Sequence, residues 1–117
     1  MLSGSVIHGD GFGRQLGYPT ANIPPTKAAT YFRPGVYAAS VTLGSEKYKA
    51  ALAIHDKHSK IEVFLMDYQG PDFYGVYITI DPLQRLSEME PYDSVDELKD
   101  KIASDVEMVR EYFAQKK

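Results

Sequence analysis

The spacing of the apolar residues changes once along this chain, near residue 94, and this change limits the possible folds more than any other feature. Before it, residues alternate with a period of two, as in GVYAASVTL (35–43), where Tyr37 and Val41 fall on one face and Val36 on the other. After it, apolar residues recur every three or four positions. The first period is typical of strands and the second of a helix. The sequence therefore predicts a run of strands followed by one helix.

Five segments before residue 94 have the composition and length of strands. GVYAASVTL and KYKAALAI (47–54) are separated by the turn GSE, which predicts an antiparallel hairpin. KIEVFLMDY (60–68) and FYGVYITIDPL (73–83) predict two further strands, the second ending near Pro82, with a turn at QGPD between them. A short strand is also expected in SGSVIHG (3–9).

The predicted helix has a marked start and one apolar face. Ser94, followed three residues later by Glu97, forms a capping box. The apolar face comprises Val95, Leu98, Ile102, Val106, Val109 and Phe113. Strand after strand and then one helix favours a closed antiparallel barrel with the helix packed against it, because closure removes unpaired sheet edges. An open sheet covered by the helix is the alternative.

Length and composition indicate a single domain over residues 1–117, with 44% hydrophobic residues to form a modest core. The net charge of −3 gives no general attraction to nucleic acid or acidic membranes. The chain has no cysteine, which excludes disulfides, thiolate metal sites and a thiol nucleophile. It shows neither an apolar stretch of membrane length nor a signal-peptide pattern, so we expect a soluble, cytoplasmic monomer.

The segment GDGFGR is rich in glycine, with Gly9, Gly11 and Gly13 followed by Arg14. Glycines allow backbone N–H groups to approach phosphate oxygens, and Arg14 could add a charge-assisted contact. The spacing is neither that of a P-loop nor a convincing dinucleotide fingerprint. A phosphate-binding loop and a simple flexible connection both remain open from these residues.

The next segment, GYPTAN, contains a rigid proline followed by two residues with side-chain oxygens, Thr20 and Asn22. In an extended segment, residues two apart point to the same side, so both oxygens could reach one hard cation such as the Mg²⁺ that accompanies nucleotides. The alternative is a hydrogen-bonded turn, for which Thr and Asn are ordinary residues.

Glu62 is a candidate general base. On a strand it shares a face with Phe64 and Met66, and partial burial among such neighbours would raise its pKa. The alternative is an exposed carboxylate on a mixed face.

Two other patterns could indicate either a ligand site or ordinary structure. His55 and His58 have the H-x-x-H spacing of some metal sites, but the polar surroundings HDKHSK favour a solvated turn. Four aromatic residues could stack on a planar ligand or simply pack within the sheet. They are Tyr68, Phe73, Tyr74 and Tyr77.

Taken in order, these segments resemble the riboflavin kinase family, including the C-terminal kinase module of bacterial bifunctional FAD synthetases. The Pro-Thr-Ala-Asn turn is the most specific part of the resemblance. The matching segments are GSVIHGDGFGRQLGYPTANIP, PGVYAASV, IEVFLMDY, DFYGVYITI and YDSVDELKDKIASDVEMVR.

The resemblance implies a six-stranded antiparallel Greek-key barrel with a C-terminal helix. It also implies transfer of the γ-phosphate of ATP, with Mg²⁺, to the terminal ribityl hydroxyl of riboflavin, giving FMN and ADP. Glu62 would then take the proton of the attacking hydroxyl, and Arg85 and Tyr92 would border the flavin. Residues expected at the Mg²⁺–nucleotide are Gly9, Gly11, Gly13, Arg14, Thr20 and Asn22, of which Thr20 and Asn22 would bind the metal.

The segment AIHDKHSKIE departs from the family pattern. It lacks the Gly and Pro-Thr that usually precede the glutamate strand, and Phe64 stands where the family has a histidine. This shortened connection motivates an alternative, a non-catalytic flavin- or nucleotide-binding sensor or regulatory module on the same barrel. A structural barrel within a larger assembly is a third possibility. Because no adenylyltransferase module precedes Met1 in this sequence, we do not expect the chain to make FAD by itself.

Overall fold

The computed structural model describes residues 1–8, 17–18 and 20–115. The predicted phosphate-binding residues Gly9, Gly11, Gly13 and Arg14 therefore lie outside the described residues. The described strands are β1 (Leu2–Ser5), β2 (Ala21–Ile23), β3 (Gly35–Leu43), β4 (Glu46–Ile54), β5 (Ile61–Leu65) and β6 (Tyr77–Ser87). Two short 3₁₀ helices, η1 (Ala28–Tyr31) and η2 (Asp56–His58), and the α-helix α2 (Val95–Gln115) complete the described elements.

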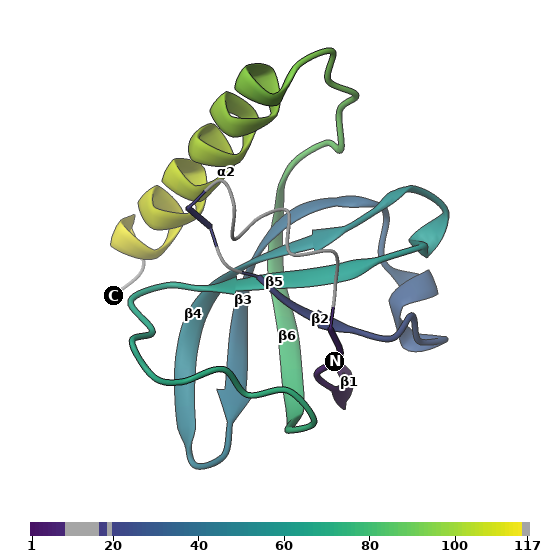
Figure 1. The fold of residues 1–117 in the computed structure, drawn as a ribbon, viewed down its shortest axis with the longest axis vertical. Coiled ribbons are helices and arrows are strands. Elements are labelled where there is room, and N and C mark those ends of the chain that lie inside the picture. Colours follow the sequence, from purple (N-terminus) through teal and green to yellow (C-terminus); the bar gives the residue numbers. More distant parts are fainter. Residues whose placement is uncertain (9–16, 19, 116–117) are drawn as a thin grey trace.

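The six strands form one antiparallel sheet in the order β1-β6-β3-β4-β5-β2 (Figure 1). The sheet curls until its two edges meet, because the chain just after β1 reaches β2. There, the backbone N–H of Ile7 donates a 2.8 Å hydrogen bond to the carbonyl of Asn22. This bridge nearly closes the barrel, so the prediction of an antiparallel barrel with a C-terminal helix is confirmed.

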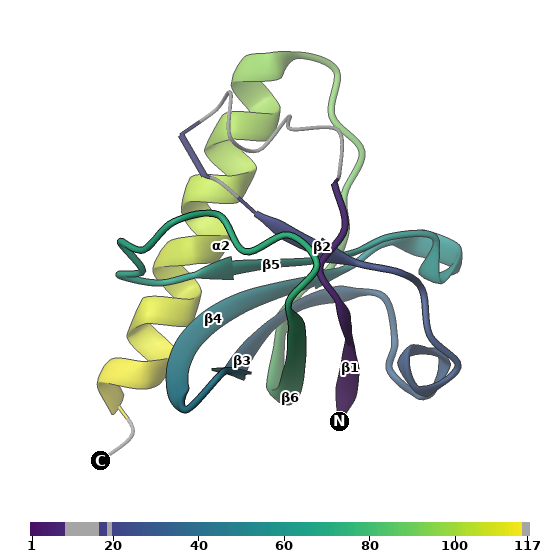
Figure 2. The ribbon, with the colours of Figure 1, turned by 60° about the horizontal axis from the view of Figure 1, so that its bottom comes forward.

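The barrel wall separates two apolar cores. Tyr37, Ala39 and Val41 of β3 point into the barrel, whereas Val36 and Ala38 point outward to the helix. This is the two-residue alternation expected from the sequence, with both faces buried. The outer core lies where α2 crosses the barrel wall, as Figures 1 and 2 show from two sides.

The hairpin of β3 and β4 matches its prediction. Leu43 pairs with Glu46, so a two-residue loop joins the strands. Gly44 has a φ of +63°, which two-residue hairpin loops require and which glycine adopts without steric cost.

The predicted limits of the last strand were wrong at both ends. Phe73 to Val76 forms a turn closed by a 3.1 Å hydrogen bond, with Gly75 at a φ of +82°, so β6 starts only at Tyr77. The strand then continues past Pro82. Ala39 pairs with Pro82 and Ala38 with Gln84, so a β-bulge accommodates the residue that lacks an N–H.

The helix begins where the capping residues predict. The hydroxyl of Ser94 accepts a 3.1 Å hydrogen bond from the N–H of Glu97, while the Glu97 carboxylate accepts one from the N–H of Asp93. The predicted apolar face is correct from Leu98 onward, but Val95 is exposed. In the described part of the chain, no helix is both long and apolar enough to span a membrane.

Candidate active site

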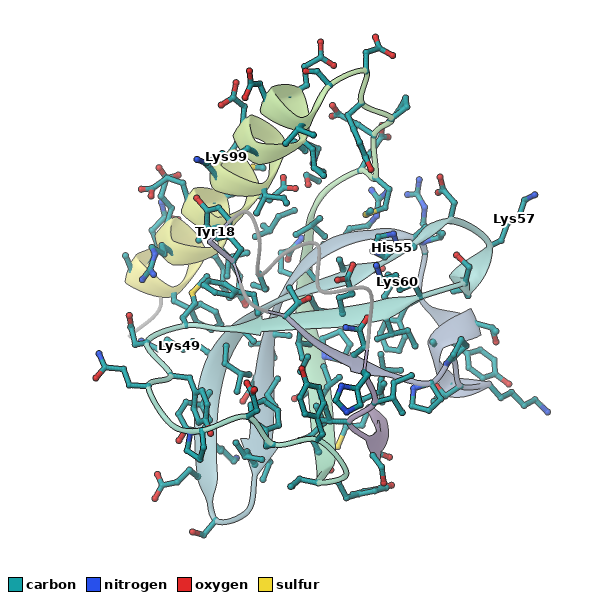
Figure 3. The ribbon with its side chains drawn as sticks, viewed as in Figure 1. Tyr18, Lys49, His55, Lys57, Lys60 and Lys99 are labelled. Atoms are coloured by element: carbon teal, nitrogen blue, oxygen red, sulfur yellow. The ribbon has the colours of Figure 1, made fainter. Side chains whose placement is uncertain are left out.

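A cavity of about 700 Å³ lies between the barrel wall and α2. One end is polar and carries Thr20, His55 and Glu62, whereas the middle is apolar. In Figure 3, His55 and Lys60 lie close together at the polar end, whereas Lys57 and Lys99 point away from the molecule. The apolar part of the lining includes Tyr18, Val36, Ala51, Phe64, Met89, Ile102 and Val106.

Glu62 faces the cavity because of its place in β5. Ile61, Val63 and Leu65 alternate with it and are buried inside the barrel, so Glu62 and Phe64 point outward. The predicted shared face of Glu62 and Phe64 is thus confirmed. The Glu62 side chain is only 14% exposed, so it belongs to the cavity wall and not to the open surface.

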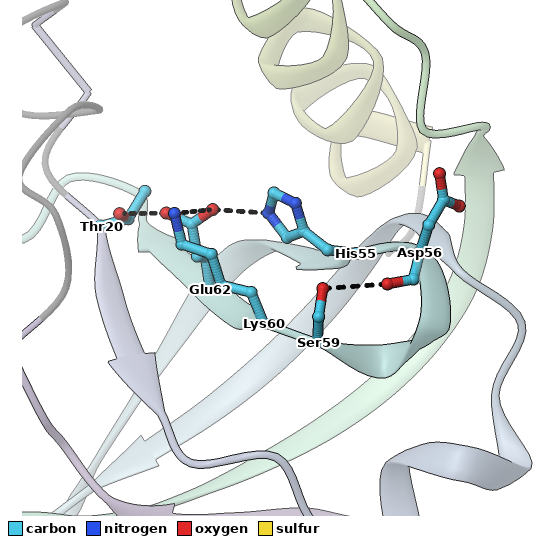
Figure 4. Close-up of polar contacts among 6 residues, drawn as sticks. All are labelled: Thr20, His55, Asp56, Ser59, Lys60 and Glu62. Carbon is cyan, nitrogen blue, oxygen red and sulfur yellow. Dashed lines mark hydrogen bonds and ion pairs between the residues drawn. The ribbon is translucent and has the colours of Figure 1, made fainter.

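Thr20 and Asn22 both lie beside Glu62. The hydroxyl of Thr20 donates a 2.9 Å hydrogen bond to Oε2 of Glu62 (Figure 4). Asn22 is the direct cross-strand partner of Glu62 in the pairing of β2 with β5, and it is buried. Thr20 and Asn22, the two residues of the Pro-Thr-Ala-Asn motif with side-chain oxygens, are therefore held next to the candidate base, although only Thr20 of the two lines the cavity.

His55 and Lys60 approach the other oxygen of the same carboxylate. His55 Nε2 lies 2.6 Å from Glu62 Oε1, and Lys60 Nζ lies 3.5 Å from it. The interpretation of HDKHSK as a simple solvated turn was therefore wrong for His55. The pairing of β4 with β5 explains the contact. It places Ala53 opposite Glu62 and Ile54 opposite Ile61, and a 3.0 Å hydrogen bond from the N–H of His55 to the carbonyl of Lys60 extends it by one more pair.

The two histidines contact different partners, His55 the carboxylate of Glu62 and His58 a backbone carbonyl. His58 Nε2 lies 2.7 Å from the carbonyl of Phe32 and so ties this connection to the segment after η1. Among the described residues, no group of three or more His, Cys, Asp or Glu side chains could hold a metal ion. The connection is tightly folded, because Lys57 and His58 both have left-handed φ values, of 60° and 55°.

The pKa of Glu62 is lowered, which corrects the expectation that burial would raise it. Burial has the largest single effect and does raise the pKa. Hydrogen bonds from His55 and Thr20, together with the charges of Lys60 and His55, lower the pKa and outweigh burial. Glu62 is therefore ionised at neutral pH and can accept a proton.

Aromatic side chains line the cavity, among them Tyr92, which the resemblance places beside the flavin. Tyr18 and Phe64 pack edge to face at 5.8 Å, and Tyr92 lies at the rim. The four aromatic residues that could have stacked on a planar ligand are not among the described residues that line the cavity: Tyr68, Phe73, Tyr74 and Tyr77. Tyr68 and Phe73 pack on each other, Tyr74 stacks on His8, and Tyr77 donates a hydrogen bond to Ser3.

A largely buried ionic cluster, two members of which line the cavity, was not predicted from the sequence. Lys101 Nζ lies 2.7 Å and 2.8 Å from the two carboxylate oxygens of Asp105, and the hydroxyl of Ser87 donates a 2.8 Å hydrogen bond to Asp105. The available signal was the position of Asp105, which follows Ile102 by three residues and precedes Val109 by four on the apolar face.

The two polar ends of the cavity are separated along one row of the sheet. Ser87 pairs with Val36, Val36 with Ala53, and Ala53 with Glu62. This row spans three strand spacings of about 4.8 Å, or about 14 Å along the sheet. The cavity thus suits an elongated ligand with an apolar body.

Arg85 is not among the described residues that line this cavity. Its guanidinium donates hydrogen bonds of 3.0 Å and 2.8 Å to the carbonyl of Pro34 and packs over Gly35. The predicted role of Arg85 beside a flavin stays a prediction, as does that of Tyr92 at the rim.

Comparison with known proteins identifies related chains. The riboflavin kinase model of the flavokinase family matches residues 1–113. The bifunctional riboflavin kinase/FMN adenylyltransferase of Buchnera aphidicola subsp. Acyrthosiphon pisum is 35% identical over 121 residues, which cover 96% of this chain and 38% of that protein. This chain therefore spans well under half the length of that curated relative.

Two solved structures share the fold. A riboflavin kinase from Trypanosoma brucei superposes with a TM-score of 0.71 at 29% identity, over 98% of this chain and 80% of that one. A Streptococcus pneumoniae structure described as a macrolide-efflux protein superposes with a TM-score of 0.75 at 31% identity, over 92% of this chain and 37% of that one.

Proposed function

We propose a function from one premise that the comparisons show: this chain belongs to the riboflavin kinase family. The proposed reaction transfers the γ-phosphoryl group of ATP to the terminal ribityl hydroxyl of riboflavin and yields FMN and ADP. The observation that carries the proposal is the 2.9 Å contact between Thr20 and Glu62 in the wall of the large cavity. It joins a candidate nucleotide ligand to a candidate base, the proximity that in-line phosphoryl transfer needs.

In the proposed step, the hydroxyl oxygen of riboflavin attacks the γ-phosphorus, and the bond from that phosphorus to the ADP oxygen breaks. The hydroxyl proton passes to the carboxylate of Glu62. Because the lowered pKa keeps Glu62 ionised at neutral pH, the carboxylate is in the form that accepts this proton. The transition state is loose and the proton leaves late, so orientation of the hydroxyl contributes more than basicity.

Mg²⁺ enters with ATP as part of the substrate and neutralises charge on the phosphates. Near Glu62, the described residues proposed to supply oxygen ligands are few: Thr20, whose hydroxyl contacts Glu62, and Asn22, its cross-strand partner. Such a sparse set fits Mg²⁺, which keeps several waters and is bound largely through phosphates. We assign the remaining phosphate contacts to Gly9, Gly11, Gly13 and Arg14. This assignment rests on the glycine-rich sequence GDGFGR alone.

The apolar middle of the cavity supports a planar flavin ring between the barrel and α2. Tyr18, Phe64 and Ile102 provide apolar and aromatic walls there. The row of about 14 Å along the sheet from Ser87 to Glu62 would let the ribityl chain point toward Glu62 while the ring lies against the helix. Tyr92 at the rim is proposed to border the ring.

A second candidate function is a non-catalytic flavin- or nucleotide-binding module. One observation favours it: both oxygens of Glu62 are engaged by side chains of the chain itself, including His55 from the shortened connection. A pure binding module would need no base, whereas this carboxylate is kept ionised in the cavity wall.

Incubation of the purified chain with riboflavin, ATP and Mg²⁺ separates these functions. The proposed kinase forms FMN in proportion to enzyme concentration. Flavin binding without FMN above background would favour the binding module, and the absence of both would favour a structural barrel.

A further inference from the structure

His55 makes a direct side-chain contact with the candidate base, and the proposed reaction gives it no other role. Its Nε2 lies 2.6 Å from Glu62 Oε1, which is within strong hydrogen-bond range. We propose that His55 is a positioning residue that fixes the Glu62 carboxylate for catalysis. This proposal deepens the proposed kinase function and rests on it.

The two carboxylate oxygens of Glu62 have different partners. Oε1 receives His55 and faces the ammonium group of Lys60. Among the described contacts, Oε2 accepts a hydrogen bond only from the hydroxyl of Thr20, which leaves it a lone pair for a second donor. The geometry therefore assigns Oε1 to anchoring by His55 and Oε2 to the substrate hydroxyl.

The protonation of His55 follows from the state of its partner. An ionised carboxylate only accepts hydrogen bonds, so Nε2 must carry the proton in this contact. The donor is the ring nitrogen farther from the backbone. This detail identifies a conservative replacement, because the side-chain amide nitrogen of glutamine reaches about as far as Nε2, whereas that of asparagine corresponds to Nδ1.

Hydrogen bonds fix the backbone of the connection that carries His55. The N–H of His55 donates a 3.0 Å hydrogen bond to the carbonyl of Lys60, which extends the pairing of β4 with β5 to the cavity mouth. His58, three residues later, anchors the same connection through the carbonyl of Phe32. The two histidines thus have different tasks: His58 holds the backbone of the connection, and His55 holds a side chain of the cavity. His58 is the matched control.

Steady-state kinetics of FMN formation tests the proposal with four variants. We expect His55→Ala to lower kcat by about tenfold or more, because a small displacement of a base is costly, while the KM for riboflavin changes little. His55→Gln should recover most of the lost turnover, and His55→Asn should recover less. His58→Ala should lower the melting temperature with kcat close to that of the wild type.

Wild-type kcat in His55→Ala would overturn the proposal, as would His55→Gln turning over as slowly as His55→Ala. Thermal melts of each variant separate loss of folding from loss of turnover. The rescue by glutamine keeps the test valid if the alanine variant is unstable.

A readout without activity separates failure of this inference from failure of the kinase function. Long-range ¹H–¹⁵N spectra of the imidazole rings report which nitrogen carries the proton. In the wild-type chain at neutral pH, we expect a proton on Nε2 of His55, and we expect Glu62→Ala to weaken that preference while leaving His58 unchanged. The same His55 spectrum in both proteins would overturn the pairing, even if FMN is formed. Absence of FMN from the wild type would instead reject the kinase function.

Discussion

Thr20 donates a 2.9 Å hydrogen bond to Glu62, although 42 positions separate the two residues in the sequence. The contact exists because β2 and β5 are neighbours in the barrel, with Asn22 directly opposite Glu62. The segment Thr20–Asn22, which leads into β2, is therefore attached to the candidate base. The hydroxyl of Thr20 donates its proton to Glu62, which leaves its lone pairs for a cation.

Replacing Thr20 tests whether its hydroxyl serves the nucleotide site. We expect Thr20→Val, which keeps the shape and removes the hydroxyl, to raise the Mg²⁺ and ATP concentrations needed for half-maximal FMN formation. Thr20→Ser keeps the hydroxyl and should stay close to the wild type. If Thr20→Val changed only the melting temperature, Thr20 would have a structural role and would not act as a ligand.

Stability should fall on acidification in a way that depends on Glu62. Its folded-state pKa lies below the ordinary value of 4.5, so its ionised form stabilises the fold above that pH. As the pH falls from about 4.5 through the folded-state pKa, this contribution is lost, because the unfolded chain then binds more protons than the folded one. Chemical denaturation at a series of pH values should show a shallower acid loss for Glu62→Gln than for the wild type. Parallel curves would show that the hydrogen bonds from His55 and Thr20 do not favour the ionised form.

The residue patterns predicted five of the six described strands and the helix, but neither β2 nor the contacts that join the elements. The two-residue alternation of Val36, Tyr37 and Ala38 was enough to define the two faces of β3, because the period alone determines which side chains share a side. It could not show that His55 meets Glu62, since that contact depends on the register of β4 with β5. The direction of the Glu62 pKa shift was also wrong, because the sequence suggested burial but did not show the donors that oppose it.

The same limit explains two further differences between the sequence prediction and the structure. A proline normally ends a strand, but Pro82 is accommodated by a bulge whose existence depends on the pairing with β3. Asp105 was overlooked because a single acidic residue on an apolar helix face does not by itself indicate a polar cluster. Its role is evident only from its contacts with Lys101 and Ser87.

The ionic cluster of Lys101, Asp105 and Ser87 should contribute to docking of α2. Both charged side chains are largely buried, at 21% and 11% exposure, so removing one leaves the other poorly solvated. We expect Asp105→Asn to lower the free energy of unfolding by about 2 kcal/mol, and Lys101→Met to restore part of it in the double variant. Denaturant unfolding of the single and double variants measures this coupling. Additive effects would show that the pair acts only as two separate polar groups.

Gly35 should tolerate no side chain, because Arg85 and the strand β6 lie directly above it. A Cβ there would lie 2.6 Å from Arg85 Nε and 2.7 Å from the carbonyl oxygen of Ser87, and the φ of Gly35 is +152°. We expect Gly35→Ala to destabilise the fold by about 2 kcal/mol, since the backbone contact cannot move aside freely. Gly4→Ala is the control, because its Cβ would meet Ile23 at an ordinary 3.4 Å. Equal stabilities of the two variants would contradict this packing.

The role of Glu62 in forming FMN is the central claim, and one comparison tests it most directly. Turnover of riboflavin with ATP and Mg²⁺ is measured for the wild type, Glu62→Gln and the exposed control Glu107→Gln, while riboflavin binding is followed separately by flavin fluorescence. The account predicts FMN formation by the wild type and the control, and a loss of about 10²-fold or more in Glu62→Gln with riboflavin still bound. Unchanged turnover in Glu62→Gln would contradict it.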